Sequence, residues 1–317
     1  MSDFAASIGH SEPPDIALRA ELARGDAIVG SVAPILRHLL ANDDNSLFGD
    51  EIIARVRGIV ADIARQLVDE IDGSVAATDG GEPGLVAVDA LARDLVDVPG
   101  LMNHVHALAL EWQLTERMQG RFAVDPVLTP LLQALIASPD AATAAIAMNL
   151  LAAQARFAQA MRRMQLPLGE LPGDLLHGAL QVMRCHAQDG HGAAAEASIR
   201  ARYDESRSRL GLIARLVTGM GGGAVAALAV GHAGVAIFMT ALALASGQVR
   251  ELAVVSANEG QAARLALSLR AAGLKSEAAA EQFLAIHPEL APPEGMDRIG
   301  PDQAAAILAS GPGYPGG

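Results

Sequence analysis

The sequence predicts an all-α protein, either a multi-helix array of short stacked helices or an irregular bundle. Apolar residues make up 51% of the 317 residues, which excludes general disorder. They recur at steps of three and four, and no run alternates between apolar and polar residues between hairpin turns. The third observation is a run without Asp, Glu, Lys or Arg over residues 216–249, in which glycine recurs. Glycine accepts the left-handed conformation that ends a helix, so this run predicts short buried helices joined by tight turns.

The N-terminal part predicts a tail followed by a small helical unit. We expect residues 1–14 to form a disordered tail and residues 15–72 to form an N-terminal helical unit. The clearest amphipathic helix is expected at about 50–72, with its apolar stripe at Ile53, Val56, Val60, Ile63, Leu67 and Ile71. Such a stripe packs against a neighbouring helix or a second subunit. The sequence therefore leaves open a homodimer formed through residues 50–72.

Changes in composition divide the rest of the chain. Residues 73–84 (GSVAATDGGEPG) concentrate turn-forming residues and predict a linker. A helical-array domain is expected over residues 85–287. After it, the Pro- and Gly-rich residues 288–317 predict a tail with one short helix at about 301–310.

Proline marks two expected helix starts inside the array. Asp125-Pro126 and Ser138-Pro139 each place a capping side chain directly before proline. Proline is favoured at the first position of a helix, because the N–H that it lacks would have no partner there. Both pairs therefore predict a helix start, with Asp125 and Ser138 as the caps.

A regular glycine spacing characterises the last third of the chain. The spacing is 13 residues, at Gly221, Gly234, Gly247, Gly260 and Gly273. It predicts helices of about ten residues joined by turns of about three, and hints at an internal repeat.

Residues 242–290 resemble the C-terminal part of an uncharacterised family of alphaproteobacterial proteins, a domain of unknown function. The features that carry the resemblance are Ser246-Gly247 and the later run Arg270-Ala271-Ala272-Gly273-Leu274. That family is taken to be all-helical and HEAT-like. The resemblance implies a helical repeat fold, and it implies no activity.

Charge and cysteine content narrow the classes of function. With 23 basic and 36 acidic residues the formal net charge is −13, which disfavours nucleic acid as the main partner. A local basic patch is still conceivable at Arg200, Arg202, Arg207 and Arg209. The single Cys185 excludes an intramolecular disulfide and a cysteine-based zinc finger. The acidic start of the sequence lacks the pattern of a signal peptide, so we expect a cytoplasmic protein.

The uncharged run also raises the alternative of membrane association. A spanning helix needs about 20 apolar residues. Glycines and His232 break the run, and its uninterrupted pieces, Ala224–Val230 and Val235–Ala245, are too short. No Trp or Tyr flanks the run to form an interfacial belt. A buried core is therefore favoured, and a membrane-associated protein using residues 216–249 remains the alternative.

Two motifs suggest ligand binding, and neither is complete. Gly219–Ala224 fits the dinucleotide pattern G-x-G-x-x-A, but that pattern requires a preceding strand, and the preceding residues predict a helix. A calcium loop starting at Asp44 would place Phe48 and Arg55 where oxygen ligands are needed. We expect no bound cofactor.

Histidines are the remaining candidates for chemistry. His104 and His106 are two residues apart, and His186 and His191 are five apart, near Cys185 and Glu196. Neither spacing is typical of a zinc site, so no metal ligand is assigned. Residues formally eligible for phosphotransfer are His38, His104, His106 and His177. Trp112, the single tryptophan, is expected in the core.

These observations favour a non-enzymatic function. Stacked helices build concave surfaces that bind other proteins. We therefore expect a protein–protein interaction or regulatory scaffold of a bacterial cytoplasm, with no assigned catalytic residue. The alternatives are the membrane-associated protein and a histidine phosphotransfer protein or other enzyme whose site is formed by distant residues.

Overall fold

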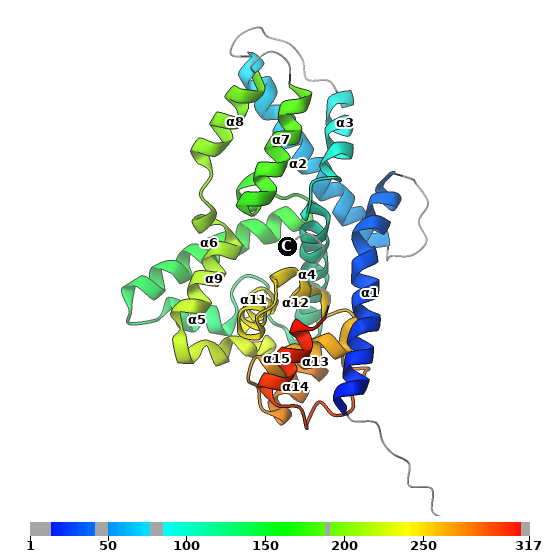
Figure 1. The fold of residues 1–317 in the computed structure, drawn as a ribbon. Coiled ribbons are helices and arrows are strands. Elements are labelled where there is room, and N and C mark those ends of the chain that lie inside the picture. Colours follow the sequence, from blue (N-terminus) through cyan, green and yellow to red (C-terminus); the bar gives the residue numbers. More distant parts are fainter. Residues whose placement is uncertain (1–13, 42–49, 77–84, 188–190, 312–317) are drawn as a thin grey trace, which may run out of the picture.

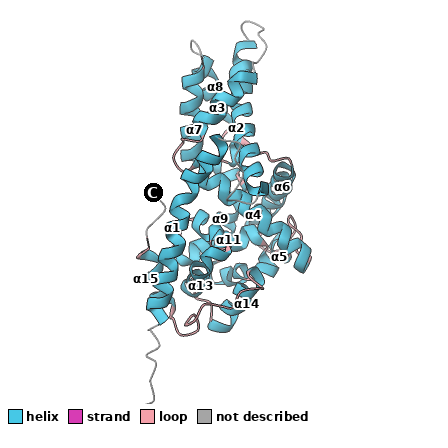
Figure 2. Cartoon of the chain, turned by 90° about the vertical axis from the view of Figure 1, so that its right-hand side faces the viewer, coloured by secondary structure: helices cyan, strands magenta, loops and turns pink. Residues whose placement is uncertain are grey.

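The computed structural model describes residues 14–41, 50–76, 85–187 and 191–311, and this part of the chain contains helices and no strand. The all-α prediction is confirmed. Figure 2 shows helices from one end of the molecule to the other, joined by short loops. Residues 1–13 of the expected tail (1–14) and residues 77–84 of the expected linker (73–84) lie outside the described residues, whereas residue 14 begins a helix and residues 73–76 end one.

One end of the molecule is a group of helices around α2 (Asp50–Ala76). It contains α3 (Leu85–Leu95), α7 (Gly173–His186) and α8 (His191–Arg202), seen together in Figures 1 and 2. The predicted apolar stripe of α2 is confirmed as core, since Ile53, Val56, Val60, Ile63 and Leu67 are all buried. The chain covers this stripe itself, with α3, α4 (Leu101–Phe122) and α8. A homodimer through residues 50–72 would have to use the exposed side of α2 and stays a prediction.

The other end is built around α11 (Val235–Ser246). Ten of its twelve residues are buried, because it is apolar on every side. Around it lie α5 (Pro130–Ile136), α6 (Ala141–Arg162), α9 (Arg209–Gly219), α10 (Val230–Ala233), α12 (Arg250–Val255), α13 (Ala262–Ala271) and α14 (Ser276–Ile286). Among the described residues no helix has the length and apolar character needed to cross a bilayer.

Glycines end the helices here as the spacing predicts. Gly234 has φ 74° and precedes α11, and Gly247 has φ 69° and caps its C-terminus. Gly273 follows α13. Gly260 differs, because it lies within the short 3₁₀ turn Glu259–Gln261. Whether these short helices form a HEAT-like repeat stays a prediction.

The two helix starts marked by proline need correction. Asp125 accepts from the N–H groups of Val127 (2.7 Å) and Leu128 (2.8 Å) in a turn, and α5 begins later, at Pro130. Similarly, α6 begins after Asp140, which accepts from the Thr143 N–H at 2.9 Å. A polar residue before proline starts a turn as readily as a helix. In both cases the residue that caps the helix, Thr129 for α5 and Asp140 for α6, comes after the turn.

Two helices from opposite ends of the sequence pack together on the outside. Figures 1 and 2 show α1 (Pro14–Ala41) running along both groups of helices. The expected short helix at the C-terminal end is α15 (Pro301–Ala309), which packs on α13. Residues of α1, α13, α15 and the segment before α15 form a small core there. Its members are Leu18, Leu22, Ala263, Leu267, Ile299, Ala304, Ile307 and Leu308.

Candidate functional site

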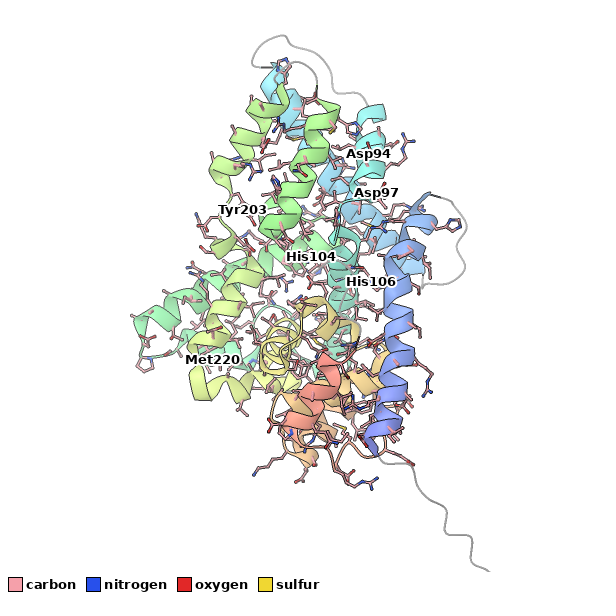
Figure 3. All side chains as sticks on the ribbon, viewed as in Figure 1. Asp94, Asp97, His104, His106, Tyr203 and Met220 are labelled. Carbon is pink, nitrogen blue, oxygen red and sulfur yellow. The ribbon has the colours of Figure 1, made fainter. Side chains whose placement is uncertain are left out.

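The glycine-rich segment Gly219–Ala224 follows a helix, as expected. Gly219 ends α9, and a 3₁₀ helix begins directly at Gly221. Figure 3 places Met220 on the left of the lower half of the molecule. A dinucleotide fingerprint needs a strand before the turn and an α-helix after it, and this segment has neither.

The histidines singled out by the sequence lie apart. His186 joins α7 to α3 through Asp94 (Nε2 to Oδ2, 2.6 Å), and the neighbouring Cys185 is exposed. Glu196 pairs instead with Arg200 at 2.8 Å. Within the described ranges no group of three or more His, Cys, Asp or Glu side chains could hold a metal ion.

The candidates for phosphotransfer fall into two classes. His104 and His106 are buried in α4, whereas His38 and His177 are exposed. The Nδ1 atom of His177 accepts from Arg200 at 2.8 Å, so it is engaged in a surface contact. Trp112 is buried against the core of the α2 group, as expected.

The main polar feature of the interior centres on the turn between α11 and α12. Gly247 ends α11, and the next polar side chains reach three different helices. Arg250 donates to Thr240 in α11 at 2.9 Å and to Glu111 in α4. Glu251 pairs with His104 in α4 at 2.9 Å. Gln248 donates to Ser268 in α13 at 2.6 Å. We call these side chains and the partners described next the polar network.

One end of the polar network is the carboxylate of Glu111, which is 1% exposed. Arg209 in α9 donates to both its oxygens, at 2.6 and 3.4 Å. The same guanidinium donates to Gln154 in α6 at 3.2 Å and stacks on the Phe157 ring, 3.5 Å from its centroid. Burial opposes ionisation of Glu111, but the charges and hydrogen bonds of Arg209 and Arg250 outweigh it and lower its pKa to about 2.

The other end of the polar network holds α1. Arg264 in α13, which is 2% exposed, donates to Gln248 at 2.7 Å and to Asp26 in α1. Next to this pair, Gln261 donates to the carbonyl oxygen of Gly25 at 2.6 Å. A Cβ at Gly25 would lie 2.8 Å from Gln261 Oε1, so the Gln261 side chain would have to move to admit a larger residue there.

The polar network is suited to holding helices and poorly suited to proton transfer. A carboxyl group with a pKa of about 2 is ionised and weakly basic at neutral pH. His106, on the same helix, has its pKa lowered by burial to about 4, so it is neutral. The cavity beside Glu111 and Arg209 has a volume of about 20 Å³, which is room for one water molecule.

A larger concave surface lies outside the polar network, between α1 and the start of α4. This groove has a volume of about 380 Å³ and is lined by Val29, Gly30, Ala33, Pro34, Arg37, Asp97, Pro99, Gly100, Met102 and Asn103. Arg37 and Asp97 form an ion pair in it at 3.7 Å, and Figure 3 shows Asp97 beside the upper part of α1. Small and apolar side chains make up most of the rest.

Sequence reasoning assigned no site residue and missed both features. A signal for the polar network was present, because Glu111 interrupts an otherwise apolar stretch of α4 and Arg209 begins an apolar helix. The pairing of Glu111 with Arg209 and with Arg250 could not be predicted from spacing, because the partners lie 98 and 139 residues apart in the sequence.

Comparison with family models, with curated proteins and with solved structures found no match. The resemblance of residues 242–290 to an uncharacterised helical family stays an expectation.

Proposed function

We propose that this protein is a non-enzymatic interaction or regulatory scaffold of a bacterial cytoplasm. The observation that supports the proposal is the groove of about 380 Å³ between α1 and α4. Its small residues, among them Gly30 and Ala33, leave room for side chains of a partner, and its apolar residues favour the apolar face of a helix.

The alternatives have less support. The central part of the uncharged run, α11, is buried among other helices, so membrane association would rest on the exposed 3₁₀ segment that precedes it. Phosphotransfer would rest on His38 or His177, because His104 and His106 are buried.

Filling the groove tests the proposal. Gly30 lines the groove, and a Cβ added there meets no atom within 4 Å, so Gly30→Trp adds a large side chain at the groove from a position with open space around the Cβ. Gly120 in α4 also has open space around it, so Gly120→Trp is the matched control. The three proteins are used as bait in an extract of the source cells, and each captured partner is then purified and titrated.

We expect a partner that binds the wild type and Gly120→Trp with equal affinity and Gly30→Trp at least tenfold more weakly. If every captured protein binds all three alike, the groove is not an interaction site and the proposal loses its support.

A further inference from the structure

Another pocket, which we call the α4–α12 pocket, lies between α4 and the turn that follows α12. Its volume is about 220 Å³, and its lining residues are Leu110, Gln113, Leu114, Arg117, Val254, Ala257, Asn258 and Glu259. None of these residues lines the groove beside α1. Sites for drug-sized ligands measure about 300–1,000 Å³, so the α4–α12 pocket suits a smaller molecule.

One helix face and one capped turn form this pocket. The wall from α4 consists of residues three or four positions apart, which share a face of the helix: Leu110, Gln113, Leu114 and Arg117. The opposite wall is the end of α12, which packs against α4. Directly after it, the Oδ1 atom of Asn258 accepts from the Gly260 N–H at 3.0 Å and fixes the turn that carries Glu259.

Two opposite charges line the α4–α12 pocket without forming an ion pair. Within the described ranges, neither the guanidinium of Arg117 nor the carboxylate of Glu259 has a hydrogen-bond or ion-pair partner. Burial lowers the pKa of Arg117, and the charge of Glu259 opposes this effect. The two groups are therefore close enough to attract each other, and both remain available to a ligand.

The buried His287 lies near both of these charges. Its ring is 2% exposed and packs against Phe283, with 5.4 Å between the ring centroids. Burial is the main cause that lowers the pKa of His287, and the charges of Arg117 and Glu259 shift it in opposite directions. The ring should therefore respond to a ligand that binds between these two charges.

This combination of groups selects the kind of ligand. A simple anion that binds Arg117 is repelled by Glu259, and a simple cation that binds Glu259 is repelled by Arg117. A small zwitterion satisfies both charges, because each of its groups forms a charge-assisted hydrogen bond. The apolar residues that complete the lining then favour an apolar group on the same ligand: Leu110, Leu114, Val254 and Ala257.

We propose that the α4–α12 pocket binds a free α-amino acid with an apolar side chain. The carboxylate of the amino acid accepts hydrogen bonds from Arg117, its ammonium group donates to Glu259, and its side chain packs on the apolar wall. This inference goes beyond the proposed function, because the ligand is a small molecule and its site shares no residue with the groove.

Isothermal titration calorimetry on the full chain tests the proposal with L-leucine, L-isoleucine, L-valine and L-methionine at millimolar concentration. The tightest binder is then compared with its carboxamide, which lacks the carboxylate, and with its N-acetyl derivative, which lacks the ammonium group. Because each derivative loses one charge-assisted hydrogen bond, we expect each to bind at least about tenfold more weakly.

Charge-neutralising variants locate the binding site. Arg117→Gln and Glu259→Gln each remove one charge from the α4–α12 pocket, and both positions are exposed. The matched controls are Arg121→Gln, one turn further along α4, and Glu277→Gln in α14, which are also exposed and do not line this pocket. The NMR signal of the His287 ring, assigned by its absence in His287→Gln, reports on binding independently.

We expect one of these amino acids to bind the wild type and both controls with equal affinity and to shift the His287 signal. It should bind Arg117→Gln and Glu259→Gln at least about tenfold more weakly. The proposal is overturned if none of the amino acids binds, or if either derivative binds as tightly as the amino acid. Equal binding to the pocket variants and the wild type, or a His287 signal that does not move, also overturns it.

Discussion

Glu111 accepts hydrogen bonds on both carboxylate oxygens from the guanidinium of Arg209, which lies 98 residues further along the chain. Arg250, 139 residues from Glu111, donates to the same carboxylate. One buried anion in α4 therefore connects α9 and α12, and through Gln154 also α6. Because Arg209 and Arg250 share this one carboxylate, losing the carboxylate of Glu111 affects α4, α9 and α12 at once.

Removing the charge of Glu111 should strongly destabilise the protein. Glu111→Gln keeps the shape of the side chain but leaves Arg209 buried without a counterion, which costs about 3–5 kcal/mol. The exposed pair of Asp97 with Arg37 supplies the control, and Asp97→Asn should cost less than about 1 kcal/mol. Urea unfolding of the two variants measures both values. Equal small losses would show that the polar network contributes little to stability.

Stability should fall as the solution is acidified below neutral pH. Burial lowers the pKa of His106 from 6.5 to about 4, so the folded state binds a proton less readily than the unfolded state. The contribution of neutral His106 to the free energy of unfolding is complete above about pH 6.5 and is lost as the pH falls towards 4. Between pH 7 and pH 5 the free energy of unfolding should fall by about 2 kcal/mol. Glu111 acts in a lower window, between its usual pKa and about 2.

The variant His106→Gln checks this assignment. Its free energy of unfolding should depend less on pH between 7 and 5 than that of the wild type. An unchanged pH dependence would mean that another group is responsible. His287, whose pKa burial also lowers, is the next candidate.

Gly234 should tolerate no side chain. Its φ of 74° and ψ of 163° lie in a region open essentially only to glycine, and a Cβ there would lie 2.4 Å from Thr129 Cγ2. Gly234→Ala should therefore destabilise the protein by at least about 2 kcal/mol. By contrast, Gly120 lies in α4 with open space around it, and Gly120→Ala should stabilise the protein by about 0.5–1 kcal/mol. Thermal unfolding of both variants measures the difference, and a neutral Gly234→Ala would contradict the turn geometry.

A charge introduced into α11 should strongly destabilise the protein on the buried side of the helix and only slightly on the exposed side. Ala241 is buried, so Ala241→Asp introduces an unpaired charge at a cost of several kcal/mol and should abolish cooperative unfolding. Leu244 lies in the same helix but is 52% exposed, so Leu244→Asp should cost less than about 1 kcal/mol. Circular dichroism during heating distinguishes the two. A folded Ala241→Asp variant that binds liposomes would instead support the membrane alternative.

The sequence predicted what depends on local periodicity. The apolar stripe of α2 and the burial of α11 both follow from the spacing of residues within one helix. The turns at Gly234 and Gly247 follow from the demands of the backbone, which glycine alone meets at little cost.

What it could not predict depends on contacts between distant segments. The sequence left open a local basic patch at Arg200, Arg202, Arg207 and Arg209. In the fold Arg209 turns into the core to meet Glu111, whereas Arg200 and Arg202 form surface pairs. The groove is formed by α1 and the start of α4, two elements that have no shared pattern in the sequence. Pairing across about 100 residues leaves no periodic signal along the chain.

The most direct test of this account is the ionisation of Glu111, because the account assigns the polar network to holding helices and not to chemistry. Carboxyl ¹³C NMR measures it, with the Glu111 resonance assigned by its absence in Glu111→Gln. We predict that this resonance does not shift between about pH 5 and pH 8, as expected for a pKa of about 2 held down by Arg209 and Arg250. A titration midpoint above about 5 would contradict the account, because a carboxyl group poised near neutrality is typical of a general acid or base.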